Sequence, residues 1–407
     1  MTEPPIREAM RSAPLPDEQA AEQRAWQLVG AAFEHDVKQQ RRGRRPRRMA
    51  RPALIFGVLF AVGAAALTPP GEALGEWISD AVRPARAPSK PALTSLPTGG
   101  RLLVTSSQGA WVVQRDGSKR RLGRYTEAGW SPGGLFVVAT RGRQLVALEP
   151  GGAVRWTLAR SAPVTRPAWS PDGFRIAYLS GSSLRAVAGD GTGDAPLTGE
   201  VAPVTPAWRP GAEHVLAYVN RLGTIVVRNG DTGNRLWRAR TFGSPTRLLW
   251  SPDGAYLVVV SREGVDVFDG AGAPMIDRAL PAGVQTGTAT INPVNGTLAL
   301  VRYRPTLDRS EVVTLPLDTG GGPIRSRPRR LFAGDGRFGD LAWSPDGRWL
   351  LLAWRDANQW LFIRSARVNK VQTISNVGRQ FDPGGDAAAP FPRVSGWCCA
   401  QSPDSQP

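Results

Sequence analysis

Short apolar runs, separated by turns rich in glycine, proline and aspartate, recur through most of the chain after residue 97. Clear examples, each followed after a turn by a second run, are Phe174–Ser180 with Leu184–Ala188, Tyr256–Ser261 with Val265–Phe268, and Trp349–Trp354 with Gln359–Arg364. Their length, their β-branched and aromatic residues and the bounding turn residues are typical of β-strands. The pattern therefore predicts an all-β domain of many short strands joined by tight turns.

The turn before each pair of runs carries a repeated sequence, Trp-Ser-Pro-Asp-Gly, intact in three copies and degenerate in three more. The copies begin at Trp130, Trp169, Trp208, Trp250, Ile291 and Trp343, so that they are 39, 39, 42, 41 and 52 residues apart. Proline presets φ, aspartate bonds to the backbone beyond it, and glycine takes a positive φ, which together suit a tight turn. One signature per period of about forty residues predicts a β-propeller with one four-stranded blade per repeat.

The two ends of the repeated region carry complementary fragments of a blade. Arg101–Ser106, Ala110–Arg115 and Lys119–Leu122 resemble second, third and fourth strands without a first, whereas the stretch ending at Trp397 resembles an isolated first strand. We therefore expect Val394–Cys398 to pair with Arg101–Ser106 and to close a ring of seven blades, which protects strand edges from aggregation. A six-bladed ring with a loose C-terminal segment is the alternative.

A different pattern precedes the strands. Between residues 17 and 38, Trp26, Val29 and Phe33 recur at three- and four-residue steps, which predicts a short amphipathic helix. An arginine-rich run ends at Arg51, and residues 52–71 contain no charged side chain. That length suits a transmembrane helix, and the arginines on one flank place the N-terminus in the cytoplasm.

These patterns divide the chain into five expected segments of a single-pass protein of the bacterial plasma membrane. They are a cytosolic tail at 1–51, a transmembrane signal anchor at 52–71, a juxtamembrane linker at 72–96, an exported propeller at 97–400 and a disordered tail at 401–407. A cleaved signal peptide is the alternative to the anchor, although the charged leader is too long for an ordinary one. The apolar stripe of the cytosolic helix is expected to dock on a cytosolic partner, on the membrane surface or on a second copy.

The formal net charge of +17 raises nucleic acid as a partner. However, the basic residues of the repeated region are spread through every repeat rather than clustered, and arginine far exceeds lysine, as GC-rich coding can produce. We interpret the charge as a generally basic exterior, and nucleic acid is not an expected partner.

By its signature the exported domain resembles the WD40-like propellers of the TolB type, in which Trp-Ser-Pro-Asp-Gly marks each blade. Two repeats depart from that pattern, because the segments ending at Trp156 and Trp237 resemble quinoprotein blades, with a glycine turn before a docking tryptophan. The resemblance implies protein or ligand binding more often than catalysis, and fold alone does not choose between them.

Several residues are candidates for chemistry. Ser131 lies in a Gly-x-Ser-x-Gly match that we interpret as accidental, because it belongs to the repeat and lacks a histidine partner. His214 is expected at the surface, and Gly189–Asp194 is expected to be a turn rather than a calcium site. The adjacent Cys398 and Cys399 are expected to be small packing residues, since a bond between neighbours is strained; a vicinal or intermolecular disulfide and metal binding are the alternatives. We therefore predict no catalytic, cofactor-binding or metal-binding residues.

The candidate binding rim lies three residues before each signature, near the start of the innermost strands, and in the longer connections. It comprises Glu127, Arg166, Arg247, Asp340, Arg379, Phe381 and Arg393, while Trp130, Trp169, Trp208, Trp250, Trp343 and Trp397 are expected to be structural. Long connections on a rigid scaffold are common places for binding. We predict a non-enzymatic interaction or sensing module. The alternatives are a transmembrane regulator that binds a cytosolic factor through Trp26, Val29 and Phe33, and a propeller enzyme or quinoprotein-like cofactor binder.

Overall fold

A computed structural model gives the fold of the chain. It describes residues 95–211, 214–281, 283–317, 327–365, 371–384 and 390–399. The predicted amphipathic helix, the arginine-rich run, the transmembrane segment, nearly all of the linker and the C-terminal tail lie outside these residues. None of the helices within the described ranges has the length and apolar character needed to span a bilayer.

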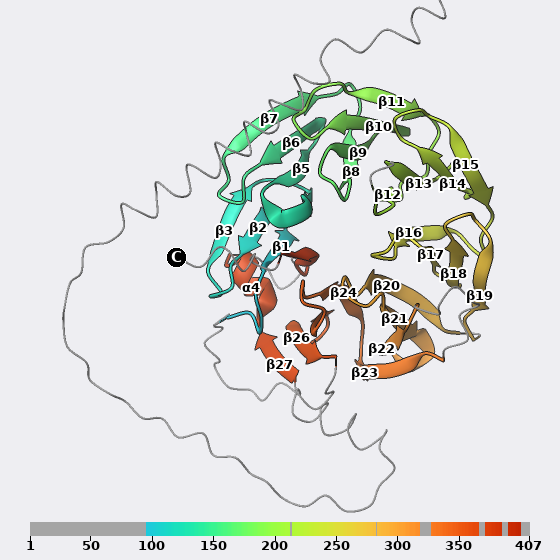
Figure 1. Cartoon of the computed structure of the whole chain (residues 1–407). Helices are drawn as coiled ribbons and strands as arrows, with labels where there is room; N and C mark the ends of the chain where they lie inside the picture. The colour runs from blue at the N-terminus through green and yellow to red at the C-terminus, as the bar shows by residue number, and fades with distance from the viewer. Residues whose placement is uncertain are drawn as a thin grey trace, which may run out of the picture. The chain divides into compact units, whose positions relative to one another are not determined.

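Seven four-stranded antiparallel sheets form the described part of the chain and are arranged as the blades of a ring (Figure 1). The first blade consists of β4 (Glu127–Trp130), β5 (Val137–Arg141), β6 (Gln144–Leu148) and β7 (Val154–Ala159), and the second of β8 (Val164–Trp169), β9 (Arg175–Ser180), β10 (Ser183–Ala188) and β11 (Ala195–Thr198). The third consists of β12 (Ala207–Trp208), β13 (Val215–Val219), β14 (Ile225–Asn229) and β15 (Arg235–Ala239), and the fourth of β16 (Pro245–Trp250), β17 (Tyr256–Ser261), β18 (Gly264–Asp269) and β19 (Pro274–Ala279).

The remaining three blades include the one that joins the two ends of the domain. The fifth consists of β20 (Gln285–Ile291), β21 (Leu298–Arg304), β22 (Arg309–Leu315) and β23 (Arg329–Asp335), and the sixth of β24 (Phe338–Trp343), β25 (Trp349–Trp354), β26 (Gln359–Arg364) and β27 (Val371–Ser375). The closing blade consists of β28 (Arg393–Cys398), β1 (Arg101–Ser106), β2 (Gly109–Val113) and β3 (Lys119–Gly123). Short helical segments lie at η1 (Pro132–Gly134), η2 (Pro305–Leu307) and α4 (Val377–Phe381).

The signature turns form because their own side chains satisfy the backbone. Ser344 Oγ donates to Asp346 Oδ1 (2.5 Å) and accepts from the Trp349 N–H (2.9 Å). Asp346 Oδ1 also accepts from the Arg348 N–H (3.0 Å), and Gly347 has φ 66°, a conformation that glycine adopts without strain. The same contacts recur at the Ser170–Asp172 and Ser251–Asp253 turns.

The ring closes as the sequence predicts. β28 pairs with β1 in antiparallel register, with Arg101 opposite Cys398, Leu102 opposite Trp397 and Thr105 opposite Arg393. This pairing joins strands nearly 290 residues apart and completes the seventh sheet, so the seven-bladed prediction is confirmed and the six-bladed alternative is wrong. A shared sheet of distant strands leaves neither of them as an open edge.

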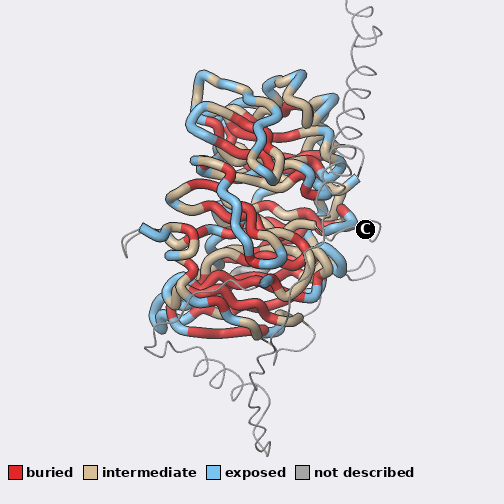
Figure 2. The backbone as a smooth tube through the Cα atoms, turned by 90° about the vertical axis from the view of Figure 1, so that its left-hand side faces the viewer, coloured by how far each residue is buried: buried red, intermediate tan, exposed pale blue. Residues whose placement is uncertain are grey.

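The hydrophobic core is divided among the blade boundaries. Seven clusters of buried residues each combine side chains from two adjacent blades, and together they account for all seven boundaries of the ring. The signature tryptophans Trp130, Trp169, Trp208, Trp250, Trp343 and Trp397 each lie in the cluster that their blade shares with the preceding one. Buried residues follow the strands and exposed ones gather at the turns (Figure 2). Each blade is therefore stabilised mainly by its neighbours.

Candidate functional site

The two faces of the ring differ in the turns that form them. The signature face carries the turns from first to second and from third to fourth strands, which include all Trp-Ser-Pro-Asp-Gly copies. The rim face carries the turns from second to third strands and the links between blades, because successive strands run in opposite directions. The innermost strands, β4, β8, β12, β16, β20, β24 and β28, begin at the rim face. The predicted rim residues of these strands therefore lie there.

β-bulges interrupt the pairing of the innermost strands beside these rim residues. The register shifts between Thr165 and Ala168, between Pro245 and Arg247, between Thr286 and Ala289, and between Phe338 and Leu341. A bulge bends a strand and re-aims a side chain, and bulges are common at rims and sites. The irregular backbone thus coincides with the positions of Arg166, Arg247, Thr288 and Asp340.

Neighbouring rim residues interact in pairs around the ring. Glu127 accepts a hydrogen bond from the Arg166 backbone N–H, and its Oε1 lies 3.5 Å from Arg166 Nη1. Arg247 Nη1 donates to Thr288 Oγ1 (2.6 Å), and Asp340 Oδ2 accepts from the Val394 N–H (3.0 Å). Glu127 and Arg166 therefore pair with each other, whereas the hydrogen-bond partner of Arg247 among the described residues is a neutral hydroxyl, that of Thr288.

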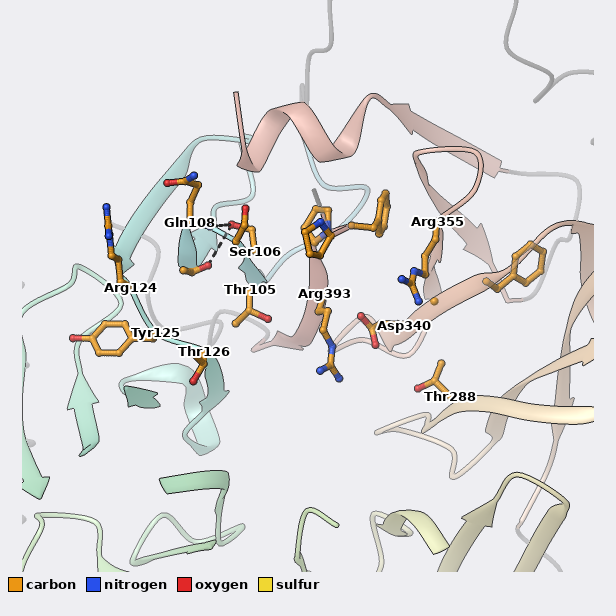
Figure 3. Close-up of a pocket in the computed structure, with 17 residues that line it drawn as sticks. Thr105, Ser106, Gln108, Arg124, Tyr125, Thr126, Thr288, Asp340, Arg355 and Arg393 are labelled. Atoms are coloured by element: carbon orange, nitrogen blue, oxygen red, sulfur yellow. Dashed lines mark hydrogen bonds between the residues drawn. The ribbon is translucent and has the colours of Figure 1, made fainter. Parts of the chain in front are cut away.

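A cavity of about 850 Å³ opens on the rim face between the closing, fifth and sixth blades (Figure 3). We call it the rim cavity. Its lining consists of Thr105, Ser106, Ser107, Gln108, Gly109, Arg124, Tyr125, Thr126, Thr288, Phe338, Gly339, Asp340, Arg355, Pro390, Phe391, Pro392 and Arg393. One wall is rich in hydroxyl groups and another is apolar, with Phe338, Phe391 and two prolines. A volume of this size suits a small molecule or a short peptide segment.

Positive charge dominates the ionisable groups of the rim cavity. Three arginines, Arg124, Arg355 and Arg393, and one acid, Asp340, line it. Burial lowers the pKa of nearby Arg247, an effect that the Asp340 carboxylate opposes and the Arg393 charge reinforces. A guanidinium stays protonated in proteins, so the consequence is a group of like charges in a concave space.

The hydroxyl-bearing wall is held by its own hydrogen bonds. Ser106 Oγ accepts from the Gln108 N–H (3.2 Å) and from Trp111 Nε1 (3.1 Å). Ser107 and Gln108 both donate to Asp382, at the end of the α4 helix, with 3.2 Å between Gln108 Nε2 and Asp382 Oδ1. These contacts fix the β1–β2 turn against α4 and leave the arginines as the groups free to meet a ligand.

Two predicted rim residues are not part of the cavity. Phe381 is only 1% exposed, because α4 folds it against Trp111 and Trp360, with ring centroids 5.9 and 5.4 Å away. The interpretation of Phe381 as a rim residue is therefore wrong, and it belongs to the core. Arg379 lies exposed on the same helix but does not line the cavity.

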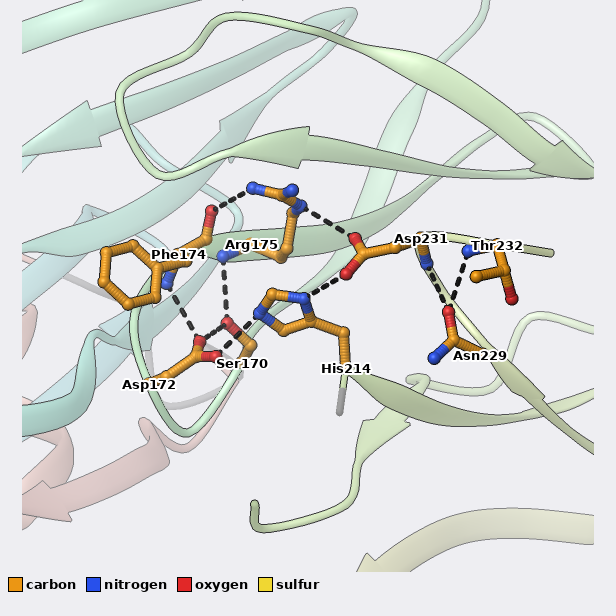
Figure 4. A network of polar contacts seen from close by, with 8 residues as sticks. All are labelled: Ser170, Asp172, Phe174, Arg175, His214, Asn229, Asp231 and Thr232. Atoms are coloured by element: carbon orange, nitrogen blue, oxygen red, sulfur yellow. Dashed lines mark hydrogen bonds and ion pairs between the residues drawn. The ribbon is translucent and has the colours of Figure 1, made fainter. Parts of the chain in front are cut away.

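His214 links two blades on the signature face and is half-buried there rather than a freely exposed surface residue. Its side chain is 13% exposed and lies between Asp172, with 2.6 Å from Nε2 to Oδ2, and Asp231, with 2.5 Å from Nδ1 to Oδ2 (Figure 4). Arg175 Nε donates to the other Asp231 oxygen at 3.2 Å. The histidine therefore has a structural role that joins the second and third blades.

The remaining candidates also have structural surroundings. Ser131 is buried and its Oγ accepts from the Phe136 N–H (2.9 Å), as its repeat counterparts do with their own backbones. Asp194 accepts hydrogen bonds from Tyr178 and Arg185 and forms an ion pair with Arg160. No group of three or more possible metal ligands occurs among the residues that the structure describes.

The structure joins Cys398 and Cys399 in a disulfide, which corrects the expectation of two packing thiols. Both sulfurs lie against Gly134, where an added Cβ would be 2.8 Å from Cys399 Sγ and 3.1 Å from Cys398 Sγ. The end of the closing strand therefore lies directly against the η1 turn of the first blade.

The docking tryptophans of the two quinoprotein-like repeats each contact the following blade. Trp156 Nε1 donates to the Gly189 carbonyl (2.9 Å), and Trp237 Nε1 donates to the Gly270 carbonyl (3.1 Å). Both contacts are made by the outermost strands, so these tryptophans fasten one blade to the next and lie away from the rim cavity.

Sequence reasoning missed Arg355 and Arg124. Arg355 begins the β25–β26 turn and Arg124 lies in the link between β3 and β4. The only available signal was their place in turns of the rim face, which many other arginines share. Of the predicted rim residues, the structure brings Asp340 and Arg393 to the cavity and places Arg247 beside it.

The chain matches no family model and no curated protein. Among solved structures it is similar to a candidate 6-phosphogluconolactonase from Bacteroides uniformis (TM-score 0.52, 14% identity, 68% of this chain and 95% of that one). It is also similar to a chain of the mitotic checkpoint complex (0.51, 16%, 74% and 97%) and to a functionally unknown protein from Desulfotomaculum acetoxidans (0.52, 12%, 68% and 94%). At these identities the likeness concerns the fold alone.

Proposed function

We propose that this chain is a non-enzymatic binding protein that takes up a protein or ligand at the rim cavity. The observation that carries the proposal is the cavity itself, where Arg355 and Arg393 face a concave space. Binding residues are commonly presented by loops on a rigid framework. The resemblance of the Trp-Ser-Pro-Asp-Gly repeats to propellers of the TolB type supports binding rather than catalysis.

Photo-crosslinking from the two faces tests this proposal. A photoreactive residue replaces either Ser107, which is exposed and lines the cavity, or Phe174, which is 48% exposed on the signature face. In full-length protein irradiated in native membranes, we expect a discrete adduct from position 107 and none from position 174. Identical adducts from both positions, or none from position 107, would contradict the proposal.

We further propose that residues 52–71 anchor the protein in the bacterial plasma membrane with the propeller outside. The uncharged length of this segment and the arginines that precede it support this topology. An alkaline phosphatase fusion after Pro97 should be active, and one before Arg41 should be inactive. The reverse pattern of activity would overturn the orientation.

A further inference from the structure

Arg355 and Arg393 reach the same space from different blades. Arg393 is the first residue of β28, and Arg355 begins the β25–β26 turn, and both point toward the region around Asp340 (Figure 3). The stem of Arg355 lies over Gly339, where an added Cβ would be 3.0 Å from Arg355 Cγ. Gly339 therefore leaves room for the side chain to lie along the cavity wall.

Within the described part of the chain, Arg355, Arg393 and Arg124 donate no side-chain hydrogen bond and form no ion pair. Asp340 is the single acid in the described lining and offsets only part of this charge; its Oδ2 accepts a hydrogen bond from the Val394 N–H at 3.0 Å. The other Asp340 oxygen, Oδ1, thus remains available to accept a hydrogen bond from a ligand in the cavity.

Like charges gathered in a concave space repel one another and are screened less than charges on a convex surface. Arg166 and Arg175 each face a carboxylate, on Glu127 and Asp231. The described lining of the rim cavity sets three arginines against a single acid, Asp340, so an anion from outside the chain would relieve their repulsion. A planar guanidinium binds a carboxylate through two parallel hydrogen bonds.

We propose that the rim cavity binds a carboxylate with a hydrogen-bond donor beside it, presented by an extended acidic peptide segment of a partner protein. The carboxylate meets Arg355 and Arg393, and a backbone N–H of the peptide donates to Asp340 Oδ1. Phe338 and Phe391 offer an apolar wall for the neighbouring side chain of the peptide. This inference rests on the proposed binding function and names the ligand chemistry of the same cavity.

Calorimetric titration of the full-length protein in detergent micelles tests the proposal. The probes are acetyl-Glu-Leu-Glu-Leu-amide, its glutamine counterpart acetyl-Gln-Leu-Gln-Leu-amide, and succinate. We expect the glutamate peptide to bind at least about tenfold more tightly than the glutamine peptide, because hydrogen bonds between charged groups are the stronger ones. Added salt should weaken the binding. Equal affinity for the two peptides, or no binding of either acid, overturns the proposal.

Matched arginine variants separate a built site from general basic charge. Arg355→Gln and Arg393→Gln should each weaken glutamate-peptide binding at least about tenfold, and Arg355→Lys should recover only part of it. Arg143→Gln removes an equal charge from the exposed β5–β6 turn on the same face, outside the cavity, and should change the affinity less than about twofold. Equal losses in all three glutamine variants would contradict a specific site. Arg355 is exposed, so its variants should fold even if Arg393→Gln does not.

Two further outcomes identify the source of the carboxylate and distinguish this inference from the proposed function. If succinate binds as tightly as the glutamate peptide and loses affinity in the same arginine variants, the ligand is a small organic acid. The proposal of a peptide ligand is then wrong. If crosslinking from position 107 captures a partner whose capture is unchanged by Arg355→Gln with Arg393→Gln, the binding function stands and the carboxylate inference fails.

Discussion

The signature face and the rim face of the propeller differ in how far their polar side chains are satisfied by other groups of the chain. On the signature face, each intact repeat places a serine and an aspartate in one turn, where they satisfy each other and the backbone. On the rim face, the residues differ from blade to blade, and the described lining of the rim cavity sets three arginines against one acid, Asp340. The repeated turns of the signature face therefore satisfy their own polar groups, whereas the varied residues of the rim cavity leave charged groups open to solvent and to a ligand.

This difference separates the residues that build the ring from those available for binding. Ser170, Ser251 and Ser344 are at most 2% exposed, so their hydroxyl groups contribute to the turn alone. Arg355 and Arg393 are exposed and contribute little to packing. Substitutions on the signature face should therefore change stability, and substitutions in the rim cavity should change binding.

The largest expected effect comes from removing the closing strand. Deletion of residues 393–407 eliminates β28, its pairing with β1 and the position of Trp397 between the sixth and closing blades. It also leaves β1 as an open edge, which promotes aggregation. We expect limited proteolysis and size-exclusion chromatography to show a protease-sensitive or aggregated domain.

The control deletion removes residues 401–407 only, leaves β28 intact and should melt within about 1 °C of the full chain, since the free energy of unfolding is unchanged. If the longer deletion also melts like the full chain, then β28 does not support the ring and the division between faces loses its structural basis.

The comparison of two alanine variants, one in the core and one in the rim cavity, gives the next largest effect. Trp397→Ala removes a side chain that is 8% exposed and stacks edge-on against Phe362, with 5.5 Å between ring centroids. Truncation of a buried tryptophan typically costs about 3–5 kcal/mol. Arg355→Ala, in an exposed turn, should change the free energy of unfolding by less than about 0.5 kcal/mol. Urea unfolding of both variants measures the two changes in the free energy of unfolding. Equal changes would contradict the distinction between residues that build the ring and residues available for binding.

The ring, its closure and most strands were predictable from the sequence because the signals are local and repeated. Tyr256–Ser261, Trp349–Trp354 and Gln359–Arg364 match β17, β25 and β26 residue for residue. The Trp-Ser-Pro-Asp-Gly turn needs only its own five residues and the adjoining backbone to form. Such short-range chemistry leaves a clear pattern, and the fragments at Arg101 and Trp397 extend it to the closing blade.

The rim cavity was only partly predictable, because its walls come from blades distant in the sequence. Spacing before the signature identified Asp340, and Arg393 is one residue before the equivalent position, but no pattern distinguished Arg355 from other turn arginines. Phe381 was misplaced because an aromatic residue in an insertion resembles an exposed loop residue, whereas α4 folds it into the core. The surroundings of His214 were missed for the same reason, since Asp172 meets it only across a blade boundary.

The smallest expected effect concerns acid stability and sharpens the distinction between the faces. Burial alone would raise the pKa of Asp346, but hydrogen bonds from Ser344, Thr98 and the Arg348 N–H, together with the Arg348 charge, lower it overall. The unfolded value is about 3.9, so the stabilising contribution of Asp346 is fully present above that pH. It is lost as the pH falls through the lower folded value, because the unfolded chain binds the proton first.

Asp346→Asn should therefore lower the free energy of unfolding at pH 7 by on the order of 1 kcal/mol, a modest figure because the carboxylate is partly exposed and screened. Near pH 3 the difference between the variant and the natural protein should be smaller than at pH 7, because the natural carboxyl becomes progressively neutral as the pH falls below the unfolded value of about 3.9. Asp340→Asn is the matched change on the rim face, and its Oδ1 can still accept the Val394 N–H. Urea unfolding at both pH values measures the two variants. If Asp340→Asn changes how the free energy of unfolding depends on pH and Asp346→Asn does not, the stability of the ring depends on the rim face. The division of roles between the two faces is then wrong.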